Sequence, residues 1–308
     1  MRSSSPPSDG RDALRWARRC LAAAVESPQA EAEILVTHVL GLNRAELYGS
    51  GSRLSTLAAE RLGELVTRRL RGEPLQYLTG HQAFRRLDLA VGPGVLVPRP
   101  ETEMLVEHAL SRLAGVALPV VVDVGTGSGA IALSIGVERP DATVWATELS
   151  AEAAAWARRN RDRVGAGNVT VVEGDLLSPL PATLRGAVDL VAANPPYLAA
   201  AQLAGLAADV RDHEPLVATV SGPTGLEVPA RVVEDALAWL RPGGWLVMET
   251  WPGQADDLLA LLSARYDEAA IHPDLTGSLR IAEARAPLEA PDRSKAPPRG
   301  AGSRRAPA

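Results

Sequence analysis

Short apolar segments alternate with helical segments over the last two thirds of the chain. Each apolar segment is bounded by glycine, proline or polar residues, at 119–124, 143–147, 169–172, 188–193 and 245–249. The intervening helical patterns lie at 130–138, 151–163, 226–240 and 254–264, and a strand pair is expected near 266–272 and 280–283. Apolar strands that alternate with helices are typical of a mostly parallel sheet covered on both faces. We therefore expect an α/β fold.

The first third of the chain has a helical pattern instead. Leu14, Ala17, Leu21 and Ala24 recur at helical spacing, and Ser55 is a plausible N-cap for a later helix. This predicts a small bundle of three or four helices. Beyond Gly72-Glu73-Pro74, residues 77–97 look like short strands around a Gly-Pro-Gly turn, which indicates a β-hairpin.

These patterns divide the chain into five segments. We expect a disordered N-terminus, a helical domain, a hairpin linker, the α/β domain and a disordered basic tail, at residues 1–10, 11–72, 73–98, 99–286 and 287–308. The 46% hydrophobic content of the 308 residues is sufficient for such cores.

Charge and cysteine content narrow the functional class. The formal net charge is −5, and basic residues gather in the tail, so the rest of the chain is more acidic still. This argues against stable nucleic-acid binding. Cys20 is the single cysteine, no apolar run reaches membrane-spanning length, and residues 1–10 lack the core of a signal peptide. We expect a cytoplasmic protein without membrane contact, and a monomer. The histidine spacing indicates no metal site.

A glycine-rich loop follows the first strand of the α/β domain. Asp123 precedes the run Gly125-Thr126-Gly127-Ser128-Gly129, in which alternate glycines let a ligand approach the main chain. The spacing differs from the dinucleotide fingerprint. An acid before the loop would repel phosphate and favour a sulfonium. The loop therefore favours S-adenosylmethionine (SAM) over NAD, although a glycine turn without a ligand has the same pattern.

Two further acids lie at the end of the second strand and just beyond the third. Glu148 is placed to accept both ribose hydroxyls, unless it is only a solvated strand end beside the N-terminus of a helix. Asp175 is placed to accept the adenine amino group, with Leu176 against the ring, although Gly-Asp is equally typical of a plain turn.

The fourth strand ends at Asn194-Pro195-Pro196-Tyr197. Two prolines fix the backbone and cannot donate hydrogen bonds, so this segment is a rigid extended corner. The Asn194 side-chain oxygen and the Pro195 carbonyl would each accept a hydrogen bond from one –NH₂ group, with Tyr197 against its planar face. Such acceptors would position an amide nitrogen and localise its lone pair toward a SAM methyl group. We therefore expect Asn194, Pro195 and Tyr197 to be catalytic, all four residues to bind substrate, and Asn194 also to contact the cofactor.

Together these residues resemble the PrmC/HemK family of protein-(glutamine-N5) methyltransferases, which methylate peptide chain release factors. The resemblance runs from about Asp12 to Ala284. Its most specific motifs are Gly72 to Gly80, Val97 to Glu103, Asp123 to Ala132 and Asn194 to Tyr197.

The resemblance implies a SAM-dependent methyltransferase domain with a Rossmann-like sheet, preceded by a small helical bundle and a linking hairpin. It implies that residues 125–129 hold SAM, that Glu148 binds the ribose, that the segment at Asp175 contacts adenine, and that Asn194 to Tyr197 bind the glutamine of a Gly-Gly-Gln tripeptide in class-1 release factors. The chain departs from the family at Glu148, where aspartate is usual, and at His213, where an aromatic residue is usual. The basic tail has no counterpart that we can place.

Three alternatives remain at this point. An N6-adenine methyltransferase would use the same corner, since adenine also presents a planar –NH₂ group, but it would need a basic groove. A SAM-binding interaction module would not need the corner. Pro98 to Glu103 either reaches the site through Arg99 or only starts a helix. We expect the bundle to dock the protein substrate.

Overall fold

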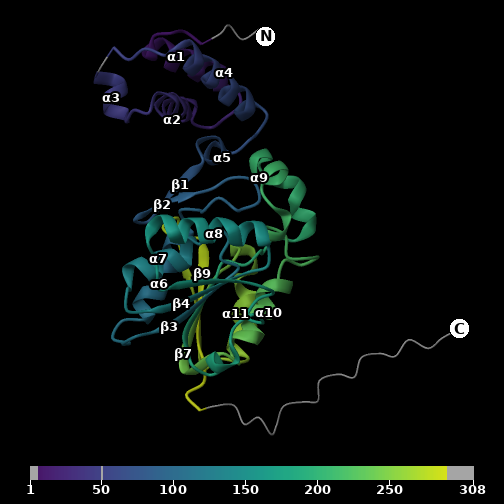
Figure 1. Cartoon of the computed structure of the whole chain (residues 1–308). Coiled ribbons are helices and arrows are strands. Elements are labelled where there is room, and N and C mark those ends of the chain that lie inside the picture. Colours follow the sequence, from purple (N-terminus) through teal and green to yellow (C-terminus); the bar gives the residue numbers. More distant parts are fainter. Residues whose placement is uncertain (1–5, 50, 290–308) are drawn as a thin grey trace, which may run out of the picture.

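A computed structural model of the protein describes residues 6–49 and 51–289. The helical bundle lies at one end of the molecule and the α/β domain at the other, with a short helix and a hairpin between them (Figure 1). The expected disorder of residues 1–5 and 290–308 lies outside the described residues.

Four helices form the bundle around a core of their own. Their bounds are α1 Gly10–Leu21, α2 Pro28–Leu40, α3 Arg44–Gly49 and α4 Thr56–Leu70. As predicted, the Ser55 side chain caps α4. The expectation of disorder up to residue 10 is wrong for its last residues, because the Asp9 side chain caps α1 by accepting from two backbone N–H groups. The bundle core consists of leucine, alanine, valine and one tryptophan, Trp16.

A one-turn helix, α5 (Leu75–Thr79), joins the bundle to the hairpin of β1 (His81–Phe84) and β2 (Leu87–Ala90). The prediction that the strands begin at Tyr77 is wrong. Pro74 precedes α5 and Gly80 ends it in the left-handed conformation, so Tyr77 and Leu78 are buried from a helical turn. The two strands are antiparallel, and Phe84 pairs with Leu87 across the turn.

Seven strands form the sheet of the α/β domain, in the order β5-β4-β3-β6-β7-β9-β8. Their bounds are β3 Val120–Val124, β4 Thr143–Glu148, β5 Val169–Glu173, β6 Val188–Ala193, β7 Leu240–Glu249, β8 Glu268–Pro273 and β9 Leu279–Arg285. The pairs from β5 to β7 are parallel, and β9 pairs antiparallel with β7 and β8. The predicted fold class is confirmed.

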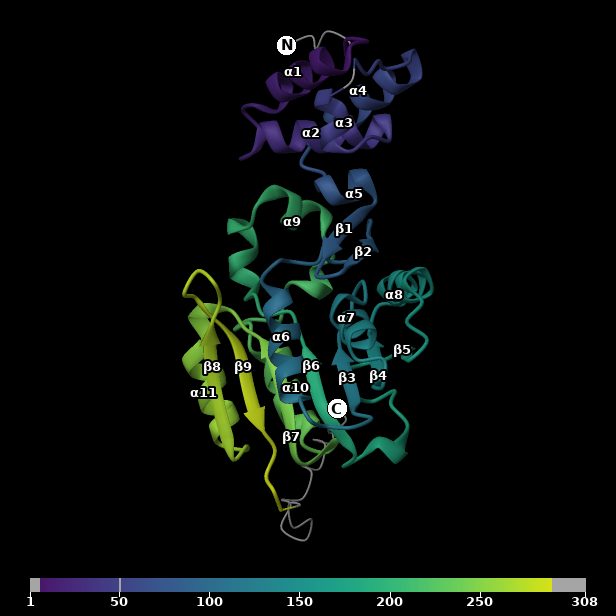
Figure 2. The same cartoon turned by 90° about the vertical axis from the view of Figure 1, so that its left-hand side faces the viewer.

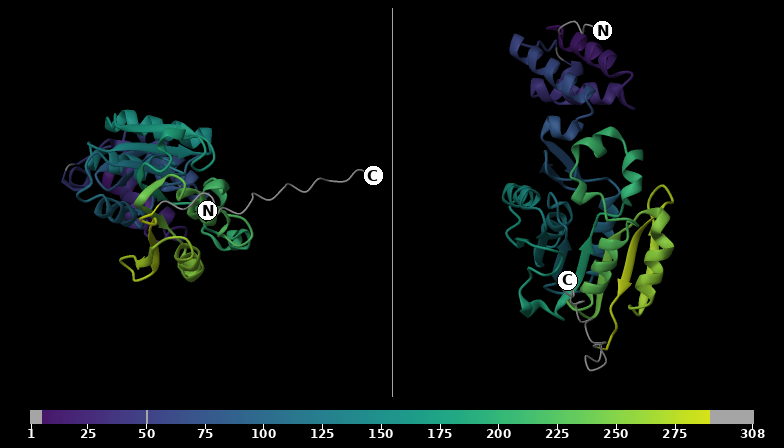
Figure 3. Two further views of the ribbon diagram at one scale, coloured as in Figure 1. Left: turned by 90° about the horizontal axis from the view of Figure 1, so that it is seen from below. Right: turned by 90° about the vertical axis from the view of Figure 1, so that its right-hand side faces the viewer.

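Helices cover both faces of the sheet (Figure 2). On one face lie α6 (Thr102–Arg112), α7 (Ala130–Glu138) and α8 (Ala151–Val164), and on the other α10 (Glu227–Ala236) and α11 (Ala255–Ser263). Alternate side chains of one strand enter different cores, as with Val121 and Val122 of β3. The bundle stands clear of these layers when the molecule is seen from the side (Figure 3, right).

Two parts of the α/β domain differ from the expected pattern. β7 begins at Leu240, five residues before the expected start, because its first residue pairs with Val188 across a register shift. The long segment between β6 and α10 contains α9 (Ala208–His213) and short 3-10 turns, which lie beside the hairpin (Figure 1).

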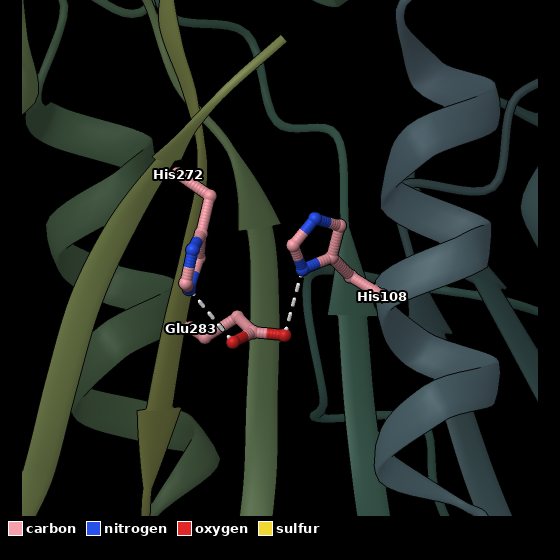
Figure 4. Close-up of side chains that lie close together, drawn as sticks. All are labelled: His108, His272 and Glu283. Carbon is pink, nitrogen blue, oxygen red and sulfur yellow. Dashed lines mark hydrogen bonds and ion pairs between the residues drawn. The ribbon is translucent and has the colours of Figure 1, made fainter.

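A polar cluster ties α6 to the antiparallel end of the sheet. Glu283 Oε1 accepts from His108 Nδ1 at 2.9 Å, and Oε2 accepts from Arg112 Nη2 at 2.6 Å and lies 2.9 Å from His272 Nε2 (Figure 4). Glu283 is buried, so these partners are what stabilise its charge.

Candidate active site

A cavity opens at the carboxyl ends of β3 and β6. Here β3 lies between β4 and β6, so the chain changes direction across the sheet, which is where ligands bind in open α/β folds. The cavity is lined by most of the predicted site residues, namely Gly125, Thr126, Gly127, Ser128, Glu148, Asp175, Leu176, Asn194, Pro195 and Pro196.

The glycine loop has a backbone that other residues rarely adopt. Gly125, Gly127 and Gly129 have φ angles of 71°, 57° and 90°. At Gly129 a Cβ atom would also lie 2.8 Å from Leu133 Cδ1, inside van der Waals contact. Gly129 lies beside this cavity wall but does not line it. The glycines therefore shape the loop, and only part of the run faces the cavity.

Asp123 supports the glycine loop from the buried side, through hydrogen bonds. Its side chain is fully buried and does not line the cavity, contrary to the expected contact with a sulfonium. Its Oδ2 accepts from Thr126 Oγ1 at 2.6 Å and from the Ala132 N–H at 3.0 Å, which joins the loop to the start of α7. Burial raises the pKa of the Asp123 carboxyl to about 7.

Glu148 is both a cavity residue and a support for the loop. Its Oε2 accepts from the Gly127 N–H at 2.8 Å, and its Oε1 accepts from the Ser150 N–H at 2.9 Å. Leu149 follows it, is 58% exposed and lines the cavity. The carboxylate therefore lies at the cavity wall with lone pairs left for further donors.

The segment after β5 also reaches the cavity. Asp175 Oδ2 accepts from Arg231 Nη2 at 2.5 Å, a partner from α10 that the sequence pattern did not indicate. Leu176 lies beside it with a φ of 47°, which is uncommon for a residue with a side chain.

The Asn-Pro-Pro-Tyr corner lies between this cavity and a second one. Asn194 lines both, and the second cavity also includes Tyr197, Leu198 and Trp251. The Tyr197 and Trp251 rings stack with centroids 6.2 Å apart. Asn194 Nδ2 donates to Thr102 Oγ1 at 3.1 Å, and within the described residues Asn194 Oδ1 accepts no hydrogen bond. The oxygen is thus the polar atom left for a ligand.

Arg99 also lies between the two cavities. Its sequence context left open whether it reaches the site. It lines both, and its Nη2 donates to the buried Glu214 at 2.5 Å. Glu214 also accepts from the Val97 N–H. Among residues 209–215, Val210, Glu214 and Pro215 line a cavity, and His213 lines neither.

Sequence reasoning missed two buried residues beside the corner. Thr102 and Glu249 are 4% and 1% exposed, and they hydrogen-bond to each other next to Asn194. The signal available was polarity at an apolar position, since Glu249 ends the strand Trp245–Glu249. Nothing in the local pattern links it to residues 102 or 194.

Two of the five histidines meet at the cluster of Figure 4. Within the described part of the chain, His108, His272 and Glu283 form a group whose geometry could hold a metal ion, although their spacing in the sequence indicated none. Arg112 already donates to both Glu283 oxygens, and none of the three residues lines either cavity. The cluster is therefore separate from the candidate site.

Two family models match the chain. The PrmC N-terminal domain matches residues 12–80, and the methyltransferase small domain matches residues 100–209. Solved structures of low sequence identity share the fold. The 16S rRNA N2 G1207 methyltransferase from T. Thermophilus, in complex with AdoMet and guanosine, has a TM-score of 0.50 and 18% identity over 67% of this chain and 49% of that one. The catalytic domain of human METTL16 with an RNA hairpin gives 0.50 and 18%, over 78% and 85%.

The sheet, its glycine loop and these matches define a methyltransferase of the Rossmann-like class. Curated relatives named release factor glutamine methyltransferase include proteins from Moorella thermoacetica, 43% identical over 84% of this chain and 92% of its relative, and Deinococcus radiodurans, 43% identical over 89% and 98%. The protein from Streptomyces coelicolor is 40% identical over 88% and 95%. The chain belongs to the release factor glutamine methyltransferase family.

Proposed function

We propose that this protein transfers a methyl group from SAM to the side-chain amide nitrogen (N5) of glutamine in the Gly-Gly-Gln motif of class-1 peptide chain release factors. One observation carries the proposal: Asn194 lies between two cavities with its amide nitrogen already bonded, and its oxygen accepts no hydrogen bond from the described residues. A hydrogen-bond acceptor at the junction of two cavities suits a donor group that enters from one and reacts toward the other.

The residues of the first cavity fit SAM. Glu148 has the acceptor capacity for ribose hydroxyls, Asp175 for an adenine amino group, and Leu149 and Leu176 present apolar surface for its ring. The glycine loop admits a ligand close to the main chain. SAM, when bound, supplies a methyl group on a positively charged sulfur.

The second cavity fits a glutamine side chain. The Asn194 oxygen, at the junction of the cavities, and the Pro195 carbonyl, at the wall of the first cavity, accept its two amide hydrogens, and the stacked Tyr197 and Trp251 rings offer an apolar wall in the second. An amide nitrogen is a weak nucleophile because its lone pair is delocalised into the carbonyl. Two fixed acceptors hold the –NH₂ group in place and favour localisation of that lone pair. The same oxygens stabilise positive charge that develops on the nitrogen.

No dedicated general base is needed in this scheme, because an alkylated amide nitrogen loses its proton readily. The Tyr197 hydroxyl donates to the carboxylate of Glu249, whose Oε1 lies 3.4 Å away. Glu249 is buried and lines neither cavity, so it is a positioning residue and does not contact the substrate.

Adenine N6 on nucleic acid is the less favoured substrate. The corner alone would suit it, and the METTL16 domain shares the fold, but the relatives that span nearly the whole chain are glutamine methyltransferases.

The described residues contain no helix that is long and apolar enough to cross a membrane. We further propose that the reaction takes place in the cytoplasm, that the protein acts as a monomer, and that the bundle docks the release factor.

Mass spectrometry of a class-1 release factor after incubation with the protein and SAM tests this function. We expect a single added methyl group on the tripeptide glutamine. Asn194→Ala is the matched low-activity variant: removal of one preorganised group at a reacting centre typically lowers the rate by about 10²- to 10³-fold, while SAM should still bind. Methylation of DNA or rRNA in place of the release factor would overturn the proposal.

A further inference from the structure

We propose that Glu249, acting through Thr102, fixes the orientation of the Asn194 amide, so that the site accepts an –NH₂ group and rejects a group that can only accept hydrogen bonds. The inference rests on the proposed function, since it explains how the same site distinguishes glutamine from glutamate.

The fold brings the three residues together from distant parts of the sequence. Strands β6 and β7 are parallel neighbours, with Ala193 opposite Met248, so Asn194 and Glu249 follow at the same edge of the sheet. Thr102 is the first residue of α6, which packs against these strands. This juxtaposition depends on the register of β6 and β7.

The hydrogen bonds between them have a defined direction. Thr102 Oγ1 lies 2.7 Å from Glu249 Oε2 and 3.1 Å from Asn194 Nδ2. An ionised carboxylate can only accept, so the single hydroxyl proton of Thr102 points to Glu249. The Thr102 oxygen must then accept from Asn194, which turns the Asn194 nitrogen inward and leaves its oxygen for the cavity.

The other oxygen of Glu249 orients the second substrate-binding residue. It accepts from the Tyr197 hydroxyl at 3.4 Å and lies 3.9 Å from Arg280 Nη1. Arg280 is held in turn by the buried Asp274 at 3.0 Å. One carboxylate thus positions both Asn194 and Tyr197. Burial raises the pKa of the Glu249 carboxyl, and the Thr102 hydroxyl and the Arg280 guanidinium oppose this shift by favouring the charged, acceptor-only form.

A neutral amide at position 249 would remove this direction. The amide of Glu249→Gln could donate to Thr102, whose hydroxyl would then donate to Asn194 Oδ1. The Asn194 nitrogen would face the cavity and offer a donor to the substrate. A glutamine substrate would lose the acceptor for its amide hydrogen, and a glutamate side chain would gain a donor for its carboxylate.

The test compares two forms of a class-1 release factor. One carries the natural tripeptide glutamine and is the substrate, and the other carries glutamate there and is a competitive inhibitor. The readout is the inhibition constant for the glutamate form divided by KM for the glutamine form. We expect this ratio to fall at least about tenfold in Glu249→Gln and Thr102→Val, the size expected from one mispaired buried hydrogen bond, and to be retained in Thr102→Ser, which keeps the hydroxyl.

Glu283→Gln is the matched control, because Glu283 is a comparably buried carboxylate of the same sheet that lies outside both cavities. It should lower stability and leave the ratio unchanged. SAM binding, measured by calorimetry, shows whether each variant is folded. If Glu249→Gln is not folded, the comparison of Thr102→Val with Thr102→Ser carries the test. An unchanged ratio in folded Thr102→Val would overturn this inference alone. A wild-type protein that does not methylate the release factor would overturn the proposed function instead.

Discussion

Asp123 is a fully buried carboxyl group beneath the glycine loop, and its ionisation couples loop stability to pH. Burial raises its pKa to about 7, against about 3.9 in an unfolded chain. Between these values the folded state keeps a proton that the unfolded state has lost. The free energy of unfolding therefore falls as pH rises through this window, because unfolding then releases a proton.

Asp123→Asn should remove this dependence while keeping an acceptor for Thr126 and Ala132. The difference in unfolding free energy between wild type and variant should shift by roughly 3 kcal/mol between pH 5 and pH 8, to the disadvantage of the wild type, given about 1.4 kcal/mol per pKa unit. Urea denaturation without ligand at the two pH values measures it. Taking the difference between the two proteins cancels the pH dependence that the other carboxyl groups contribute to both. A pH-independent difference would contradict the buried, high-pKa assignment.

At the scale of single residues, the sequence predicted the site residues that lie in contiguous motifs, and it did not predict their long-range partners. Gly125 to Ser128 and Asn194 to Pro196 line the cavity because each motif follows one strand to the same edge of the sheet. Thr102 and Glu249 act through hydrogen bonds across 92 and 147 positions of the chain, which depend on strand register. Asp123 was assigned by its place in a motif, and its burial is a property of packing.

At the scale of elements, one arginine in the turn of the hairpin joins it to the α/β domain. Arg85 has a φ of 51°, and its guanidinium donates to both oxygens of Glu138, at 2.7 and 2.8 Å, and to Glu107 at 3.1 Å. Its backbone N–H donates to Glu103 at 2.9 Å. The Arg85 and Glu138 side chains are 15% and 10% exposed. The turn is thus fixed to the end of α7 and the start of α6.

Arg85→Ala should lower the free energy of unfolding by about 3 kcal/mol, because it leaves the mostly buried Glu138 carboxylate without its bidentate partner. The matched control is Arg61→Ala on α4, where the arginine and Glu64 are 49% and 64% exposed. Exposed pairs contribute little, so this variant should change stability by no more than about 0.5 kcal/mol. Chemical denaturation of both variants is the measurement, and equal small losses would show that Arg85 does not anchor the hairpin.

The strands and helices of the α/β domain were predictable because each apolar run is bounded by residues that end it. The short elements were not. The helix α5 has only five residues, too few for a periodic pattern, and Tyr77 and Thr79 favour strands by composition. The segment with α9 contacts Arg69 and Gly72 at the end of the bundle, so its structure depends on contacts that no local pattern reveals.

At the scale of the whole molecule, the bundle and the α/β domain have separate cores. The bundle core is built from α1 to α4 with Leu78 of α5, and the cores on either face of the sheet contain no residue before Phe84. The described links between bundle and α/β domain include an ion pair between Arg69 and Asp209 at 3.9 Å. Separate cores imply that SAM binding and docking of a protein substrate can be lost independently.

Deletion of residues 1–71 tests this division of labour. The remaining chain keeps both faces of the sheet and every cavity residue, so its dissociation constant for SAM should stay within about threefold of wild type, and that affinity also reports that it is folded. Its KM for the release factor should rise by at least about tenfold, because the proposed docking surface is gone. Calorimetry with SAM and steady-state kinetics give the two values. Asp209→Asn in the full chain is the control, since it removes the charge opposite Arg69 and leaves the buried Arg69–Glu31 pair of the bundle intact, and it should leave KM within about threefold. If SAM affinity and KM worsened together in the deletion variant, the bundle would be a structural support for the α/β domain and the release factor would dock elsewhere.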